Sequence, residues 1–123
     1  MRKMQDLQRL QQLAALKLDA ALSALTTASR ARQTSLDQLA GLAIPESLPT
    51  DLSELAGRRS ALTYQRWAES RRAEINLLLA RQTADWLTAQ DAARIAFGQT
   101  EALRLLANGL AADARRRGAS THI

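Results

Sequence analysis

The sequence contains no cysteine and no valine, and its 123 residues include a single histidine and four aromatic side chains. Without cysteine there are no disulfides, thiolate metal sites or cysteine nucleophiles, and one histidine, His122, leaves few ways to build a zinc or acid–base site. Strands favour β-branched and aromatic residues, which are scarce here. These absences argue against a sheet and against most classes of enzyme.

The residues that are abundant are strong helix formers. The chain has 25 alanines, 22 leucines and 15 arginines, with only 2 lysines, and its formal net charge is +5. Alanine, leucine and arginine rank highest in helix propensity, so the chain is expected to be all-α. A basic balance of this kind favours an anionic partner without requiring one.

Helix breakers define one boundary. Pro45 and Pro49 lie close together after Gly41, which is suited to the C-terminal cap of a helix, and Asp51 with Glu54 forms a D-x-x-E capping arrangement. We therefore predict one domain over residues 1–123. It comprises a first helix at about 3–40, a loop at 41–50, a second helix at about 51–117 and a tail at 118–123.

Both predicted helices carry an apolar stripe with alternating spacings of three and four residues, which is typical of a coiled coil. This spacing predicts an antiparallel two-helix coiled-coil hairpin with a longer C-terminal helix. In the second helix the stripe reads Ile75, Leu79, Gln82, Trp86, Ala89, Ala93, Ala96, Thr100, Leu103, Ala107, Leu110 and Ala114; in the first it reads Leu7, Gln11, Ala14, Leu18, Ala21, Leu25 and Ala28.

The helices differ in length, and this suggests a binding surface. If the hairpin closes at 41–50, the first helix covers only about 51–87 of the second, and roughly 30 residues are left bare. Exposed apolar surface of this extent marks contact with another chain, either a dedicated partner or a second copy of this one. The alternative is that the second helix breaks at Gly98 or Gly109 and folds back. The predicted partner-binding residues on this overhang are Ala93, Phe97, Leu103, Leu106, Leu110, Arg115 and Arg116.

Two further candidates lie midway along the hairpin, Tyr64 and Arg71. For Trp67 and Trp86 the default expectation is packing in the core. Acidic residues lie one helical turn from several arginines, as Glu101 does from Arg104, so we interpret most of the arginines as a solvated face. No recognition module or interleaved aromatic pattern is present, and we do not expect a nucleic acid partner.

Catalysis requires a concave site that shifts the pKa of a base or nucleophile, and a two-helix hairpin has no interior large enough for one. We therefore expect a protein that is not an enzyme and binds no cofactor or metal. Charged residues interrupt any apolar run at the N-terminus, so no signal peptide and no membrane span are predicted, and a cytoplasmic location is expected.

The layout resembles a known family, the FliJ stalk proteins of flagellar type III export and their YscO-like relatives in injectisomes. The resemblance covers nearly the whole chain: a small basic protein with a shorter first helix, a turn bearing prolines and a longer second helix. The segments that carry it most are 65–67, Gln-Arg-Trp, and 96–106, which begins Ala-Phe-Gly-Gln-Thr-Glu, followed by the Arg-rich end.

This resemblance implies a non-catalytic stalk of a bacterial protein-export apparatus. Residues 93–117 would then enter a hexameric export ATPase ring, and residues 64–72 would contact the export gate. Two other hypotheses remain open from the residues alone, a general coiled-coil chaperone or adaptor and a self-associating structural helical bundle.

Overall fold

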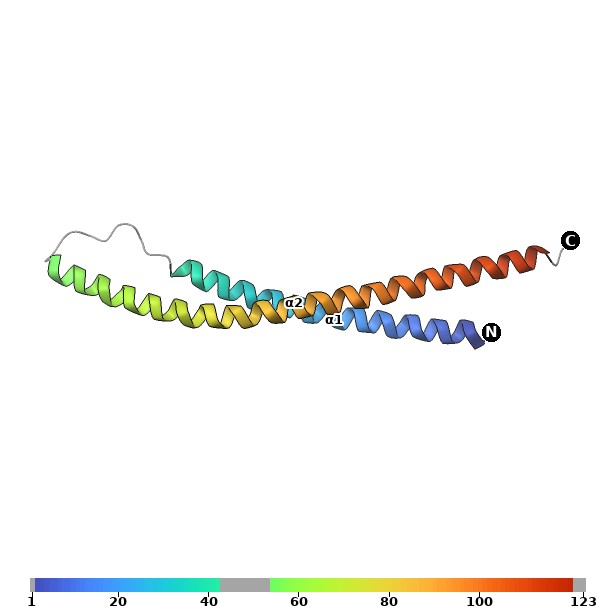
Figure 1. Ribbon diagram of the computed structural model, residues 1–123, viewed down its shortest axis with the longest axis horizontal. Coiled ribbons are helices and arrows are strands. Elements are labelled where there is room, and N and C mark those ends of the chain that lie inside the picture. The colour runs from blue at the N-terminus through green and yellow to red at the C-terminus, as the bar shows by residue number, and fades with distance from the viewer. Residues whose placement is uncertain (1, 43–53, 121–123) are drawn as a thin grey trace. The chain divides into compact units, whose positions relative to one another are not determined.

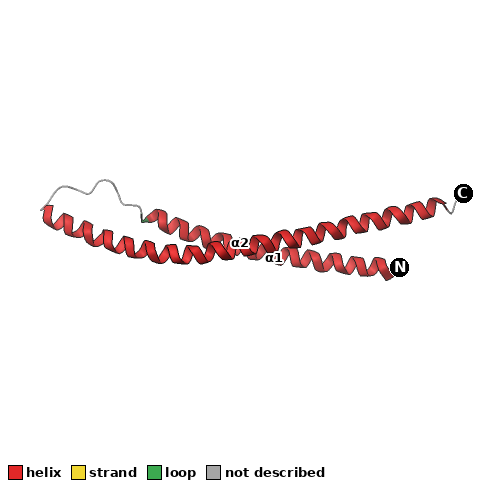
Figure 2. Ribbon diagram, viewed as in Figure 1, coloured by secondary structure: helices red, strands yellow, loops and turns green. Residues whose placement is uncertain are grey.

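The computed structural model describes residues 2–42 and 54–120, with the side chains of Glu54, Leu55 and Ser120 excepted. Within these residues the chain forms two helices, α1 (Arg2–Gly41) and α2 (Glu54–Ser120), and Leu42 follows α1 in a turn (Figures 1 and 2). The prediction of an all-α helical hairpin is confirmed. The predicted loop at 43–50 and the predicted helix start at 51–53 lie outside the described residues.

Strong helix formers fill both elements, and neither contains a proline. α2 is unbroken through Gly98 and Gly109 and reaches Ser120, while α1 ends at Gly41. After this end the Leu42 amide donates a hydrogen bond to the Leu39 carbonyl at 3.1 Å. The helices are 40 and 67 residues long.

The chain divides into two compact units. We call residues 1–26 with 87–123 the terminal unit, and residues 27–86 the central unit. In each, a segment of α1 packs against a segment of α2, so each unit has its own set of interhelical contacts. The two units are described separately below.

The central unit is held together by an apolar cluster and by polar contacts. Leu42, Ala68 and Ile75 are buried together, with Leu39 packed against them. The buried Ser35 hydroxyl donates to the Gln82 side-chain oxygen. The Arg32 guanidinium lies 5.1 Å from the centre of the Trp86 ring, a cation–π contact. These pairs run in opposite directions along the two helices, which makes the packing antiparallel.

In the terminal unit most of the buried side chains are alanines: Ala14 of α1 and Ala93 and Ala96 of α2. Leu7 is buried as well. Thr100, a polar residue of the predicted stripe, is half-buried, and its hydroxyl donates to the Ala96 carbonyl at 3.0 Å, so it needs no partner on the facing helix. Small side chains with locally satisfied polar groups allow two helix backbones to approach closely.

Burial follows the predicted spacing of three and four residues in both helices. In α2 every position of the predicted stripe from Ile75 to Leu110 is buried or half-buried, whereas Ala114 is exposed. In α1 every position from Leu7 to Ala28 on the stripe is buried or half-buried. We call these two stripes the seam.

The predicted overhang, in contrast, is wrong. The end of α2 that was expected to be bare packs with residues 1–26 in the terminal unit, where the Lys17 ammonium donates to the Gln99 side-chain oxygen at 3.1 Å. The cause is the register. Leu42, after the end of α1, lies against Ala68 and receives a hydrogen bond from Arg72 at 3.5 Å, so α1 does not begin its pairing at the start of α2.

Candidate functional site

The predicted partner-binding residues of the terminal unit do not share one surface. Ala93 is buried, and Leu103 and Leu110 are half-buried, as residues of the seam. Phe97 and Leu106 are exposed, with 56% and 53% of their surface accessible. Only these last two present an apolar side chain to solvent while the two helices remain packed.

Phe97 and Leu106 lie on opposite flanks of the seam. Phe97 stands four residues before Glu101 and seven before Arg104, so it belongs to a polar flank. Leu106 stands seven residues after Gln99, which lies on the other flank. Both were expected on one overhang because each is close to a position of the stripe.

The arginines among the predicted residues are exposed, and two of them are paired locally. Arg116 forms an ion pair with Asp113 at 2.7 Å, and Arg71 forms one with Glu74 at 3.1 Å. Pairs of this kind on a helix surface stabilise it by only a few tenths of a kcal/mol. Arg115, next to Arg116 in the sequence, is exposed as well. The local pairing leaves Arg71 and Arg116 with little uncompensated charge for a ligand.

The closest electrostatic coupling on the polar flank joins Arg104 to Glu101. The guanidinium donates through Nε and Nη2 to the same carboxylate oxygen, at 3.2 and 2.9 Å. This hydrogen bonding and the attraction of the negative charge raise the pKa of Arg104, which is charged in any case. The flank that holds Phe97 is therefore lined by a pair already satisfied within α2.

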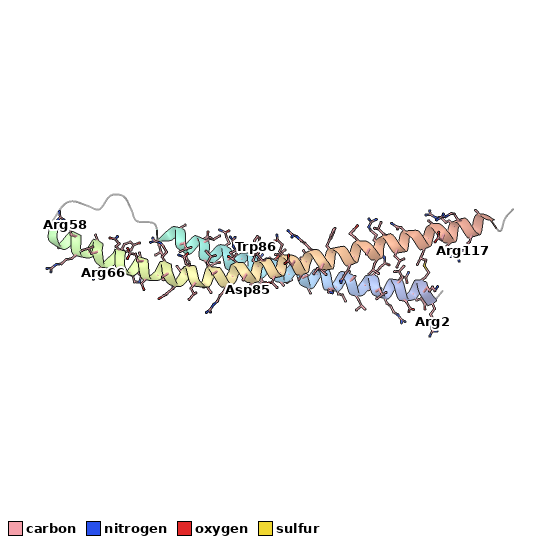
Figure 3. All side chains as sticks on the ribbon, viewed as in Figure 1. Arg2, Arg58, Arg66, Asp85, Trp86 and Arg117 are labelled. Atoms are coloured by element: carbon pink, nitrogen blue, oxygen red, sulfur yellow. The ribbon has the colours of Figure 1, made fainter. Side chains whose placement is uncertain are left out.

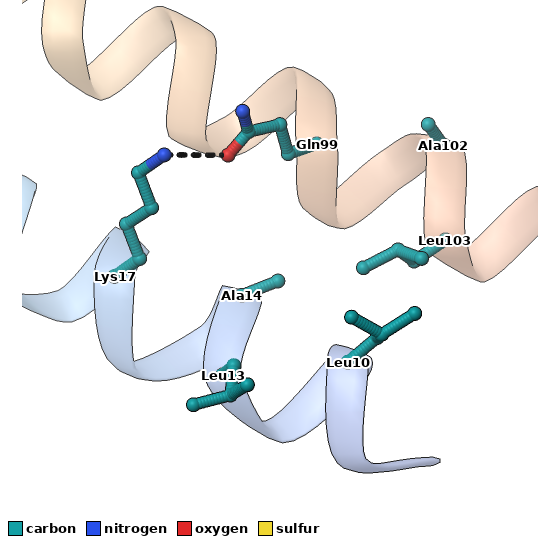
Figure 4. A pocket seen from close by; sticks show the side chains of 7 residues that line it. All are labelled: Leu10, Leu13, Ala14, Lys17, Gln99, Ala102 and Leu103. Carbon is teal, nitrogen blue, oxygen red and sulfur yellow. Dashed lines mark hydrogen bonds between the residues drawn. The ribbon is translucent and has the colours of Figure 1, made fainter. Parts of the chain in front are cut away.

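The other flank of the terminal unit contains a shallow groove between the helices (Figure 4). Leu10 and Leu103 approach each other across it, and the hydrogen bond from Lys17 to Gln99 closes one end. Its lining residues are Leu10, Leu13, Ala14, Lys17, Gln99, Ala102 and Leu103. Five of these seven are apolar.

Large apolar side chains of α2 continue this groove outward. Ile95 lies one turn before Gln99, and Leu106 lies one turn after Ala102. Each is more than half exposed, as are Leu10 and Leu13. We call this surface the terminal apolar face; it consists of Leu10, Leu13, Ile95 and Leu106.

The central unit has a second exposed surface near the start of α2. The rings of Tyr64 and Trp67 lie 5.8 Å apart, centre to centre, at a tilt of 41°. They line a shallow hollow with Arg59, Ser60 and Thr63. Trp67 is 55% exposed, so the expectation that it packs in the core is wrong: it lies one residue before Ala68, and that offset turns it away from the seam. Trp86 does lie at the seam, half-buried beneath Arg32.

Within the described side chains, no group of three or more His, Asp or Glu residues is placed to hold a metal ion. Neither described helix has the length of apolar sequence needed to cross a membrane. Comparison of the chain with family models, with curated proteins and with solved structures finds no match.

Sequence reasoning missed two groups of surface residues. Leu13 and Ile95 were not singled out, although their spacing relative to the seam predicts a second apolar flank. Trp67 was expected in the core, and Arg59 was not connected with it. The signal for the second group is the absence of any acidic residue between Glu54 and Glu69.

Proposed function

We propose that this protein is a non-catalytic helical adaptor that binds another protein through the terminal apolar face. The carrying observation is the exposure of four large apolar side chains on one flank of the terminal unit although α1 and α2 are paired there. Exposed apolar side chains gathered on one flank of a helix pair favour contact with further helices.

The specific form of the proposal is a stalk of a flagellar or type III protein-export apparatus in the cytoplasm of a bacterium. It rests on the resemblance of the helical layout to the FliJ and YscO-like proteins. In this form the terminal unit enters the export ATPase ring through its apolar face, and the part of α2 around Tyr64 and Arg71 faces the export gate. A partner helix seated on Leu13 and Ile95 would remove both side chains from water.

The test is co-purification of the chain with the export ATPase of its own host. Replacing Ile95 and Leu106 by aspartate puts two charges into the proposed contact without touching the seam, because both side chains are more than half exposed. We expect the amount of ATPase retained to fall at least about tenfold, the loss typical of central apolar contacts.

Phe97→Asp is the matched control. Phe97 lies on the same helix with equal exposure but on the opposite flank, so retention of the ATPase should stay near the wild-type level. Circular dichroism would verify that both variants remain helical. If the variant with both Ile95 and Leu106 replaced retained as much ATPase as the wild type, the proposal would be wrong. If Phe97→Asp alone lost the ATPase, the contact would lie on the polar flank instead.

A second candidate function, a self-associating helical bundle, is favoured by one observation. Both α1 and α2 contribute to the terminal apolar face, so two copies placed face to face would assemble four helices around Leu10, Leu13 and Leu106. If this is the function, light scattering of the purified chain gives a dimer mass that does not change on dilution. Leu13→Asp is then expected to give a monomer, and a monomeric wild-type chain would exclude this candidate.

A further inference from the structure

One part of α2 carries arginines but no acidic residue. Residues 55–68 contain Arg58, Arg59 and Arg66 and no acidic residue. Farther along α2, Arg71, Arg94, Arg104 and Arg116 each form an ion pair with an acid three residues away. Among the described side chains, none forms an ion pair with Arg59 or Arg66. Arg59 and Arg66 can therefore pair with acidic groups of a ligand.

The arginines lie beside the exposed aromatic rings. Arg59 and Arg66 are seven residues apart and thus lie on the same side of α2, with Thr63 between them and Trp67 one turn beyond Thr63. Tyr64 packs against Trp67. Together these five residues form what we call the basic aromatic surface, and each is exposed.

The described part of α1 does not reach this surface. The end of α1 meets α2 at Ala68 and Arg72, where Arg72 donates to the Leu42 carbonyl. Figure 3 shows Arg58 and Arg66 on the stretch of α2 that precedes this contact. Tryptophan, tyrosine and arginine are the residues most enriched at the energetic centres of protein interfaces.

We propose that the basic aromatic surface binds an acidic amphipathic helix of a partner protein. Glutamates or aspartates of that helix would pair with Arg59 and Arg66, and an apolar side chain would lie in the hollow against Trp67 and Thr63. Arginine binds carboxylates with two parallel hydrogen bonds, which gives the contact direction as well as attraction. This inference concerns a different surface from the terminal apolar face. It overlaps the part of α2 around Tyr64 that the specific form of the proposed function turns toward the export gate, and it gives that part a chemical class of partner without depending on the gate assignment.

The observations favour a protein partner over nucleic acid. Tyr64 and Trp67 pack on each other at 5.8 Å, so no space remains between the rings for a base to stack on both. The basic aromatic surface holds two arginines, Arg59 and Arg66, whereas binding to phosphate backbones uses an extended basic groove. One ring pair with flanking arginines matches the size of a single helix contact.

The experiment uses the whole chain in a Trp86→Phe background, which leaves Trp67 as the single tryptophan. The probe is a helical peptide of about 20 residues with leucines on one face and glutamates along its edges, and its twin carries glutamine in place of glutamate. We expect the acidic peptide to shift the Trp67 emission to shorter wavelength, with an affinity that falls as salt is raised.

Replacing both Arg59 and Arg66 by alanine is expected to weaken this binding by about tenfold or more. The control replaces Arg81 and Arg94 by alanine, two exposed arginines of α2 outside the surface, and so removes the same net charge; its binding should stay within about twofold of the parent chain. Three results would each overturn the proposal: no binding of the acidic peptide at low salt, equal binding of its glutamine twin, or tighter binding of a single-stranded oligonucleotide or of anionic vesicles. None of these depends on the terminal apolar face, so this proposal and the proposed function fail separately.

Discussion

Replacing Ile75 by aspartate is expected to lower the free energy of unfolding by about 3–4 kcal/mol. Ile75 is 2% exposed and belongs to the buried cluster with Leu42 and Ala68. The substitution removes an apolar side chain from that cluster and puts a charge there without an ionic partner, and both effects destabilise the folded chain. Urea denaturation followed by circular dichroism measures the change.

Leu77→Asp is the control for this prediction. It introduces the same charge into the same helix two residues away, at a side chain that is 63% exposed. The expected loss is below about 1 kcal/mol and comes mostly from the lower helix propensity of aspartate. Similar losses for the two variants would mean that the cluster at the end of α1 contributes little to stability.

Replacing Ala96 by leucine is expected to destabilise the chain by about 2 kcal/mol. Ala96 is 1% exposed in the seam of the terminal unit, where the buried side chains are mostly alanine. A leucine there adds three heavy atoms to a filled space and forces the helices apart or the side chain out of its rotamer. Thermal unfolding of the variant beside the parent chain checks this.

Ala92→Leu serves as the comparison because Ala92 is exposed four residues earlier on α2. Its unfolding free energy should stay within about 0.5 kcal/mol of the parent value, since leucine and alanine are both good helix formers. If Ala96→Leu proved neutral or stabilising, the helices would not approach each other as closely at this point as the burial of alanine indicates.

The fold class and the seam were predictable from the sequence because both depend on local pattern. Alternating spacings of three and four residues place Ile75, Ala93 and Leu103 on one side of a helix whatever lies opposite. The burial or half-burial of these three residues confirms the predicted stripe. The two prolines predict the break between the helices in the same local way.

The register was not predictable from the same pattern. A stripe of alanine and leucine fits its partner at several offsets that differ by a heptad, so the length of each helix does not determine where pairing begins. The structure selects the offset through particular pairs. Ser35 bonds to Gln82, and Arg32 covers Trp86. These pairs depend on residues far apart in sequence, and a reading of each helix alone cannot find them.

The candidate surfaces illustrate the same limit. Phe97 and Leu106 separate onto two flanks by their positions on α2 alone, whereas the approach of Leu10 to Leu103 across the groove depends on the register. Trp67 lies outside the core because the residue that packs at the seam is its neighbour Ala68. A surface formed by two helices requires their relative offset, whereas the basic aromatic surface lies on one helix and its charge imbalance was already present in the sequence.

The polar contacts of the central unit affect how easily α2 can slide along α1 when a force acts along the helices. Sliding α2 along α1 by one heptad, about 10 Å, would strand the Ser35 hydroxyl and the Gln82 amide against apolar neighbours, at a cost of about 1–3 kcal/mol for each group left unbonded. A seam of alanine and leucine alone would slip with little resistance. The hydrogen bond between Ser35 and Gln82 therefore resists sliding of the helices, so that a force applied along one helix is transmitted to the other.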